Sequence, residues 1–393
     1  MLSGFFEFGY LLLLVFASST LLCGLAGWAF NFRFFNKLGR KPRLIKCPGI
    51  SVIVPVKGAD EHTESNLVKL VLHANGQPLQ VIVAMEEKSD PAYDKACRVK
   101  ERFPWADISI VLSGCSAGRM AKVHNMSAGY NVAKYDYIGF MDADVVVNKT
   151  SLLQACQALA DSATGAVSVV PCYEFPVDAG SALVGIYANY YYIPLFIAVT
   201  EVGGAAILNG GFMVIKRADI VAIGGLERFA NHISDDASLG RAIHDRGRKV
   251  QVLPNIVTMP QSQTEVPEAL RQLLKWFIIG RGFLGPFFVG YLSMFPIMLS
   301  VLLLLVSWVL GRGLGYPAGL LAASLVFRVG GAVWLDKKIH GNCSALWVYP
   351  LIPIFEICLA PYLWIRAVFC KYVVWKGKKY RLEKNGRVTG VGS

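Results

Sequence analysis

The chain of 393 residues lacks internal repeats, low-complexity tracts and closely spaced cysteine motifs. Its nine cysteines form no C-x-x-C pair and follow no regular spacing, so the sequence offers no zinc site of the usual kind. We therefore expect reduced, small apolar cysteines in a reducing compartment. Acidic residues are also few, 27 against 39 lysines and arginines, which leaves a net charge of +12. Much of the basic excess lies beside apolar segments, where attraction to anionic lipid headgroups explains it better than nucleic-acid binding does.

Long stretches near both ends of the chain contain no charge at all. Three such runs are long enough to cross a bilayer: 9–30, 283–310 and, interrupted only by Arg328, 316–335. The first run is too long for a cleaved signal peptide, Glu7 precedes it and basic residues follow it. A fourth apolar stretch, 345–370, contains three prolines, Glu356 and Arg366. The composition therefore predicts an integral membrane protein.

Basic residues beside the apolar segments predict how the chain crosses the membrane. Those that follow the first segment are Arg33, Lys37, Arg40, Lys41, Arg43 and Lys46. They predict an outer N-terminus and a cytoplasmic middle region. The tail is also basic, with Lys371, Lys376, Lys378, Lys379, Arg381, Lys384 and Arg387. A cytoplasmic tail requires the stretch 345–370 to enter and leave on one side, as a re-entrant or interfacial hairpin. The alternative is an ordinary span with a basic outer tail.

The region between 31 and 282 has the pattern of a soluble α/β domain. Short apolar runs predict strands at 49–56, 79–85, 108–112 and 136–147, with helical stretches between them. This alternation predicts a parallel sheet with helices on both faces. Ligands of such sheets bind beyond the carboxyl ends of the strands. Polar residues that follow the strands are therefore the candidates for a functional site.

Two carboxylates one residue apart, Asp142 and Asp144, end the hydrophobic strand predicted within 136–147. Side chains at i and i+2 of a strand point the same way, so both carboxylates can converge on one divalent cation. Such a cation takes oxygen ligands and typically bridges a phosphate. Taken alone, the pair is explained about as well by the capping of a turn.

Further polar segments follow other predicted strands. Acidic residues at 86–90 end the second strand, and the Asn-Gly-Gly sequence at 209–211 has bare backbone that can approach a ligand closely. Ser234, Asp235 and Asp236 open a predicted helix. An N-cap with acidic charge in the first turn is the simpler explanation for one of these two aspartates.

An amphipathic helix leads into the second membrane segment. Gln272, Lys275 and Trp276 share one face of it, at positions i, i+3 and i+4. A tryptophan and a lysine at this place are also typical of an anchor at the membrane interface.

Six motifs follow one another in order along the middle of the chain. They are ISVIVPVKGAD, SDPAYD, GRMAKVHNMSAGYNVAKYDYIGFMDADVVV, NGGFMVIKRADI, GGLERFANHISDDASLGRAIHDRGRKV and QLLKW. Together they closely resemble the ceramide glucosyltransferases, membrane enzymes of the GT-A nucleotide-sugar transferase class. The ending WKGKKYRL is similar to the W-x-x-G-x-Y-R-L tail of that family.

The resemblance implies a division of the chain into four parts. It implies an α/β GT-A domain with a mostly parallel sheet and membrane helices at both ends. The parts are an N-terminal transmembrane helix at 1–31, a cytoplasmic GT-A glycosyltransferase domain with an amphipathic interface helix at 32–282, C-terminal membrane segments at 283–370 and a basic cytoplasmic tail at 371–393. The expected location is a bacterial inner membrane, with the catalytic domain facing the cytoplasm.

The resemblance also implies roles for individual residues. Asp236 would be the catalytic base, and Asp142 with Asp144 would hold Mg2+ or Mn2+. The residues implied in donor binding are Glu87, Asp90, Lys122 and Asp142. Those implied near the diphosphate and the acceptor are Gln272, Lys275 and Trp276.

Two positions depart from the family pattern. Lys275 stands where the motif has arginine, so a point-charge ammonium replaces a bidentate guanidinium. The tyrosine-rich stretch 187–192 stands where the eukaryotic enzymes have a histidine. These departures leave the identity of the acceptor open.

The implied reaction is transfer of a hexose, glucose or a related sugar, from a UDP-sugar to the hydroxyl of a ceramide-like lipid, with inversion. A hopanoid or diacylglycerol glycosyltransferase is an alternative, and a processive polysaccharide synthase shares the aspartates. The non-enzymatic alternative is a transporter subunit with a nucleotide-sensing domain. Few ionisable groups lie inside the apolar segments, which argues against a transport path.

Overall fold

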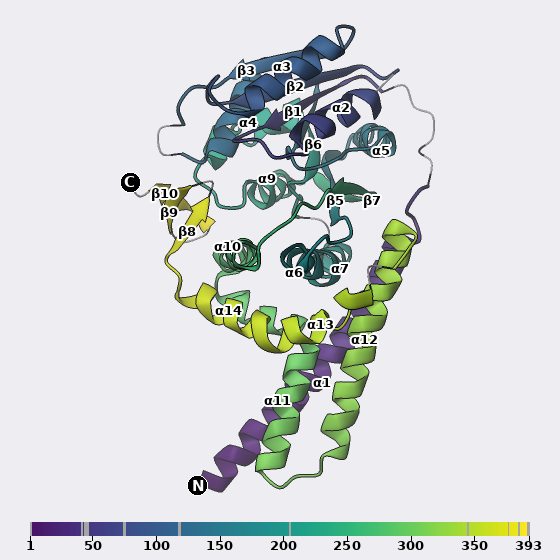
Figure 1. Ribbon diagram of the computed structural model, residues 1–393, viewed down its shortest axis with the longest axis vertical. Coiled ribbons are helices and arrows are strands. Elements are labelled where there is room, and N and C mark those ends of the chain that lie inside the picture. Colours follow the sequence, from purple (N-terminus) through teal and green to yellow (C-terminus); the bar gives the residue numbers. More distant parts are fainter. Residues whose placement is uncertain are drawn as a thin grey trace. The chain divides into compact units, whose positions relative to one another are not determined.

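A mostly parallel sheet of seven strands organises the central part of the computed structural model (Figure 1). The strands lie in the order β3-β2-β1-β4-β6-β5-β7. Their bounds are β1 Ile50–Pro55, β2 Leu79–Met85, β3 Asp107–Leu112, β4 Tyr137–Met141, β5 Thr164–Tyr173, β6 Phe212–Lys216 and β7 Lys249–Met259. Only β6 runs antiparallel to its neighbours, β4 and β5. The predicted α/β class and mostly parallel sheet are confirmed.

The chain divides into two compact units, and the structure describes most of both. The described residues are 2–40, 42, 47–73, 76–116, 119–203, 206–343, 346–375, 377–383 and 386–390. The helical unit comprises Met1–Arg33, Glu174–Ala198 and Gln261–Cys370. The α/β unit comprises Phe34–Tyr173, Val199–Pro260 and Lys371–Ser393. Several basic residues used to predict the orientation lie outside the described residues, namely Lys41, Arg43, Lys46, Lys376 and Lys384.

Helices cover both faces of the seven-stranded sheet. They are α2 Thr63–His73, α3 Ala92–Arg102, α4 Ala121–Asn131, α5 Lys149–Leu159, α8 Arg217–Ala222 and α9 Asp235–His244. Along β1, Val52 and Val54 face one buried cluster, which includes Leu70 of α2, and Ile53 faces the other, which includes Met126 of α4. Burial on both faces explains why the strands are continuous apolar runs.

The basic tail predicted at 371–393 forms a second sheet in the α/β unit. Its three antiparallel strands are β8 Tyr372–Trp375, β9 Lys378–Leu382 and β10 Val388–Gly390, in the order β10-β9-β8. Residues from the two ends of the α/β unit's sequence therefore belong to one folded body.

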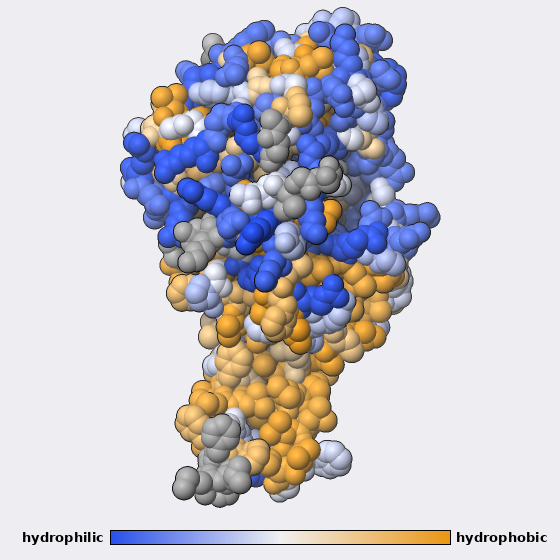
Figure 2. All heavy atoms as spheres, turned by 90° about the vertical axis from the view of Figure 1, so that its left-hand side faces the viewer, coloured by the Kyte–Doolittle hydropathy of each residue, from blue (hydrophilic) through white to orange (hydrophobic). Residues whose placement is uncertain are grey.

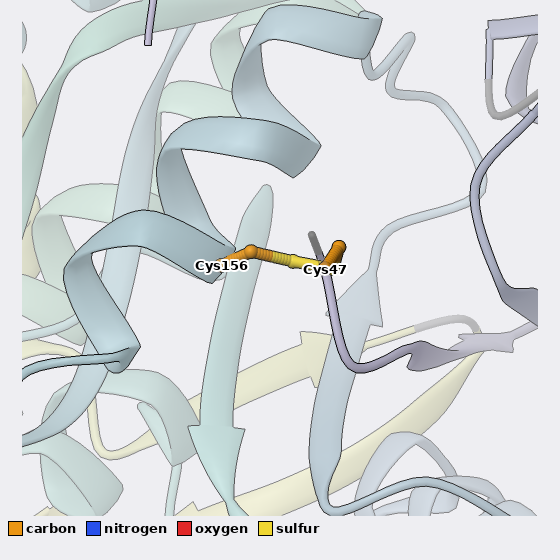
Figure 3. Close-up of a disulfide and its surroundings, with 2 residues drawn as sticks. All are labelled: Cys47 and Cys156. Atoms are coloured by element: carbon orange, nitrogen blue, oxygen red, sulfur yellow. A yellow bond between two sulfur atoms is a disulfide. The ribbon is translucent and has the colours of Figure 1, made fainter. Parts of the chain in front are cut away.

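A disulfide joins Cys47, just before β1, to Cys156 on α5 (Figure 3). The prediction that all cysteines are reduced is wrong for this pair, and the other seven are free. The Cα atoms are 5.7 Å apart, which suits a disulfide. The two cysteines are 109 residues apart in the sequence, so no local spacing could reveal the bond. By the chain-entropy model, closing so long a loop stabilises the folded unit by about 5 kcal/mol.

The helical unit contains the apolar segments. Its helices are α1 Leu2–Phe35, α6 Ala179–Tyr187, η1 Ala188–Tyr192, α7 Ile193–Gly203, α10 Val266–Leu284, η3 Gly285–Met294, α11 Pro296–Val309, α12 Gly315–His340, η4 Leu346–Val348, α13 Leu351–Ile354, η5 Phe355–Leu359 and α14 Ala360–Phe369. Within this unit α1, α11 and α12 run side by side, and α13 and α14 run across their direction (Figure 1). In the face shown by Figure 2, the surface of α1, α11 and α12 is almost continuously hydrophobic.

Five helices of the described chain are long and apolar enough to cross a membrane. They span Phe6–Phe35, Ala179–Val202, Val266–Met294, Gly315–His340 and Leu346–Phe369. The run predicted at 283–310 is divided, because Pro296 begins a new helix after η3. The segment at 179–202 was missed by the sequence analysis. It is mostly buried, and a buried helix and a membrane helix have similar compositions.

Candidate active site

Asp142 directly follows β4, at the carboxyl end of the parallel part of the sheet. Its backbone N–H donates to the carbonyl of Gly211 at 3.1 Å, and the N–H of Val145 donates to the Asp142 carbonyl at 3.2 Å. Asp142 and Asp144 therefore lie in a turn, and the strand alternation that predicted their convergence does not apply. They still share an environment, since both add to the effect of burial in raising the pKa of the Tyr173 hydroxyl.

The charged centre of the site consists of Lys122, Asp142, Asp235 and Asp236, which we call the aspartate cluster. The Nζ atom of Lys122, in the first turn of α4, lies 2.9 Å from Oδ1 of Asp142 and 3.6 Å from Oδ2 of Asp235. The side chains of Lys122 and Asp235 are 18% and 10% exposed, and that of Asp142 is 33% exposed. Side chains from α4, the end of the next strand β4, and the much later α9 thus meet at one ammonium group.

The aspartate cluster contains three carboxylates but only one ammonium group. Burial, together with repulsion among the carboxylates, raises the pKa values of Asp142 and Asp235 to about 6. Attraction to Lys122 lowers these pKa values but only partly offsets the rise. Burial lowers the pKa of Lys122, but attraction to Asp142, Asp235 and Asp236 outweighs this and raises it. Lys122 is therefore a permanent cation among three carboxylates, a charge balance that favours a further cation.

Asp235 and Asp236 are distinguished by their surroundings. Asp235 is buried and faces Lys122, whereas Asp236 is partly exposed. Oδ1 of Asp236 accepts hydrogen bonds from the hydroxyl of Ser234 and the N–H of Ala237, both at 2.8 Å. Ser234 precedes the helix but makes no side-chain capping bond, because its hydroxyl is bound to Asp236. Asp236 is consequently the carboxylate that is both fixed in position and accessible.

Gly210, in the Asn-Gly-Gly segment, lies against this carboxylate. A Cβ atom added at Gly210 would stand 2.9 Å from Oδ2 of Asp236 and 3.2 Å from Nζ of Lys122. The sequence predicted that this bare backbone can approach a ligand, and in the structure it lies against the aspartate cluster.

A second charged group lies after β1 and β2. Nζ of Lys57 donates to Oε2 of Glu86 at 2.8 Å, and the N–H of Ser116 donates to Oε1 at 2.9 Å. Burial alone raises the pKa of Glu86, but these hydrogen bonds outweigh it and lower that pKa to about 2. Glu86 was not named from the sequence, where its neighbour Glu87 was chosen; Glu87 is exposed. The two neighbours differ in burial, since Glu86 is partly buried at the end of β2 and Glu87 is exposed.

Asp90 holds a turn beside this group. Its Oδ2 accepts from the N–H of Gly58 at 2.8 Å, and its Oδ1 accepts from the N–H of Ala92 at 2.9 Å. The carboxylate thereby ties the loop after β1 to the start of α3.

Gln272, Lys275 and Trp276 lie on α10 in the helical unit, all of them half-buried. The ring of Trp276 stacks on Tyr187 of α6, with centroids 5.7 Å apart. Trp276 therefore packs against a neighbouring helix of its own unit.

The tyrosine-rich stretch 187–192 supplies internal hydrogen bonds to the helical unit. The hydroxyl of Tyr190 donates to the carboxylate of Asp336 at 2.9 Å, and that of Tyr191 donates to Glu356 at 2.7 Å. Asp336 and Glu356 are both fully buried. These two tyrosines therefore compensate buried charge.

A divalent cation beside the aspartate cluster would rest on two carboxylates, Asp142 of the cluster and Asp144 outside it. Among the described residues, no group of three or more His, Cys, Asp or Glu side chains could hold a metal ion. Asp142 and Asp144 nevertheless suit Mg2+ or Mn2+, which often binds one or two carboxylates together with substrate phosphates. Asp142 is partly exposed and Asp144 is exposed. The residues present fit a cation that arrives with a phosphorylated ligand.

Proteins of known activity are similar to this chain along most of its length. Ceramide glucosyltransferase 1 of Caenorhabditis elegans is 20% identical over 369 residues, which cover 91% of this chain and 76% of that protein. Poly-beta-1,6-N-acetyl-D-glucosamine synthase of Staphylococcus aureus is 22% identical over 275 residues, 67% of this chain and 62% of that protein.

A solved structure has a similar fold. It is a mannosyltransferase from Pyrobaculum calidifontis in complex with GDP-Man and Mn2+, with a TM-score of 0.50 and 16% identity. The match covers 88% of this chain and 99% of that chain.

A family description accounts for nearly the whole sequence. Glycosyl transferase family 21 matches residues 13–388, which include the sheet, the aspartate cluster and the membrane helices. The resemblance to the ceramide glucosyltransferase family and the predicted GT-A fold are thereby confirmed. The chain belongs to glycosyl transferase family 21 and is a membrane glycosyltransferase.

Proposed function

We propose that the protein transfers a hexose, glucose or a related sugar, from a UDP-sugar to the hydroxyl of a ceramide-like lipid, with inversion at the anomeric carbon. The aspartate cluster carries this proposal, because it gathers a cation and three carboxylates beyond the strand ends of a glycosyltransferase fold. The similarity to ceramide glucosyltransferase 1 over 91% of the chain supports the lipid acceptor.

Asp236 is the general base in this proposal. A lipid hydroxyl becomes a good nucleophile only when a base takes its proton. The hydrogen bonds from Ser234 and Ala237 hold Oδ1 of Asp236, so Oδ2 is the atom that accepts the proton. Attack from the side opposite the leaving group inverts the anomeric carbon.

Lys122 stabilises the leaving group. Negative charge grows on the diphosphate as its bond to the sugar breaks, and a fixed cation lowers the energy of that state. Asp142 and Asp144 would hold Mg2+ or Mn2+, which supplies further positive charge as a Lewis acid. Lys275 is an additional candidate for this role, on the basis of its motif.

The proposal is tested by incubating the purified protein with UDP-sugars and lipid acceptors. UDP-glucose, UDP-galactose, UDP-N-acetylglucosamine and UDP-glucuronic acid are each offered with ceramide, diacylglycerol or a hopanoid, and the lipids are analysed by mass spectrometry. The expected product is a lipid carrying one hexose, with ceramide the preferred acceptor. No glycolipid from any pair would refute the proposal.

A processive polysaccharide synthase is the second candidate, because the Staphylococcus aureus synthase is similar over 67% of the chain. The same incubation separates the two, since a synthase extends its product into a long saccharide.

The proposed orientation places the α/β unit in the cytoplasm, where UDP-sugars are available. Disulfides are rare in reducing cytosol, so the bond between Cys47 and Cys156 makes this orientation worth measuring. We expect a membrane-impermeant maleimide to label Cys115, which is exposed in the loop after β3, only after cells are permeabilised. Gly313→Cys, between α11 and α12, should be labelled in intact cells. The reverse pattern would invert the orientation.

Gly210→Ala should lower the rate of lipid glycosylation at least about tenfold, because its Cβ would displace the Asp236 carboxylate. The melting temperature should change little. The matched control is Gly319→Ala on α12, where an added Cβ has no neighbour within 4 Å. A Gly210→Ala variant as active as the control would show that Asp236 is not held at its working position by this backbone.

A further inference from the structure

The C-terminal sheet is attached to the segment that leads into α9. The N–H of Val388 donates to the carbonyl of Asn231 at 2.7 Å, and the N–H of Ile233 donates to the carbonyl of Gly386 at 2.9 Å. His232 and Arg387 form a β-bridge between these bonds. The sheet therefore extends, through backbone pairing, to within two residues of Asp235.

The middle strand of the sheet directs two side chains toward the loops after β2 and β3. Nζ of Lys378 lies 3.3 Å from Oγ of Ser116 and 4.0 Å from Oε1 of Glu86. Tyr380 is buried, and its hydroxyl donates to the carbonyl of Arg119 at 3.5 Å. The side chains of Lys379 and Arg381 alternate with these two along the strand and are exposed, because successive side chains of a strand point to opposite faces.

The group around Glu86 has more positive than negative charge. Two ammonium groups, those of Lys57 and Lys378, share this one carboxylate. The Lys378 side chain is 42% exposed, so solvent or a ligand can reach it. A surplus cation beyond the carboxyl ends of β1 and β2, where ligands of such sheets bind, suits an anionic nucleotide.

We propose that the C-terminal sheet is part of the donor site, in which the ammonium group of Lys378 donates a hydrogen bond to the bound nucleoside diphosphate. This inference rests on the proposed function, because it takes the donor to be a nucleotide sugar. Lys378 moves from Ser116 to the nucleotide, and Lys57 continues to neutralise Glu86. The pairing at Asn231 and Ile233 holds the sheet in place during this exchange.

The inference is tested by measuring UDP binding to the purified full-length protein by isothermal titration calorimetry. Lys378→Met should weaken UDP binding at least about tenfold, because a charge-assisted hydrogen bond is lost. The KM for the UDP-sugar should rise in proportion, and the KM for the lipid should not change. Lys378→Arg should restore most of the affinity. Lys379→Met is the matched control, since its side chain is exposed on the same strand, and it should bind UDP as the wild type does.

The outcomes separate this inference from the proposed function. Equal UDP affinities for the wild type, Lys378→Met and Lys379→Met would overturn the inference and leave the proposed function standing. Tighter binding by Lys378→Met would also overturn it, because Lys378 would then obstruct the site. A wild-type protein that binds no UDP and forms no glycolipid would refute both.

Discussion

Asp236→Asn is expected to lower lipid glycosylation at least about a hundredfold while UDP-sugar binding is largely retained. Asparagine keeps the size of the side chain and can still accept hydrogen bonds from Ser234 and Ala237. It cannot accept the proton of the acceptor hydroxyl. The loss should therefore appear in kcat for transfer, measured as radiolabelled glycolipid formed per minute.

The control for this variant is Asp245→Asn, just beyond α9. Its side chain is 65% exposed and lies outside the aspartate cluster, so transfer should be unchanged. An Asp236→Asn variant that transfers at the wild-type rate would assign the base elsewhere. Asp235 would then be the next carboxylate to test, although its burial against Lys122 makes it less accessible.

Asp142→Asn is expected to lower transfer by about two to three powers of ten. Loss of this carboxylate removes one of the two side chains proposed to bind the metal and a partner of Lys122, at 2.9 Å. Lys122 would then be drawn toward Asp235 and away from the diphosphate. Asp136→Asn, before β4, is the matched control, since its side chain is 91% exposed.

Removal of metal should reproduce the effect of Asp142→Asn in the wild type. Excess EDTA should stop glycolipid formation, and Mn2+ or Mg2+ should restore it. Full activity in excess chelator would show that Lys122 alone supplies the positive charge. The Asp142→Asn variant would then remain impaired through the misplacement of Lys122 only.

The fold was predictable because its signals are local. Val52, Ile53 and Val54 form an uninterrupted apolar run, which indicates a strand buried on both faces without knowledge of its neighbours. The positions of Asp142 and Asp236 after a strand and at a helix start were predictable for the same reason. Pro296 also acts locally, but its effect was hidden within a run whose composition is uniformly apolar.

Features that depend on distant contacts were not predictable from one sequence. The disulfide of Cys47 depends on the approach of α5 to the chain before β1. The contacts of Glu86 depend on the side from which Lys57 and Ser116 approach the end of β2. The pairing of Lys122 with Asp235 likewise requires α4 and α9 to meet. These contacts between distant segments produce no periodic pattern in the sequence.

Lys371–Ser393, which are synthesised after the membrane segments, belong to the same folded body as the first strand. The α/β unit begins at Phe34 but is completed only by Lys371–Ser393, after the segments up to Cys370 have been made. Domains usually fold as they emerge during synthesis, but this unit must wait for its C-terminal sheet. If Lys378 contributes to donor binding, a nascent chain binds UDP-sugar poorly until its membrane helices have been synthesised. Catalytic competence is then delayed until the membrane helices are in place.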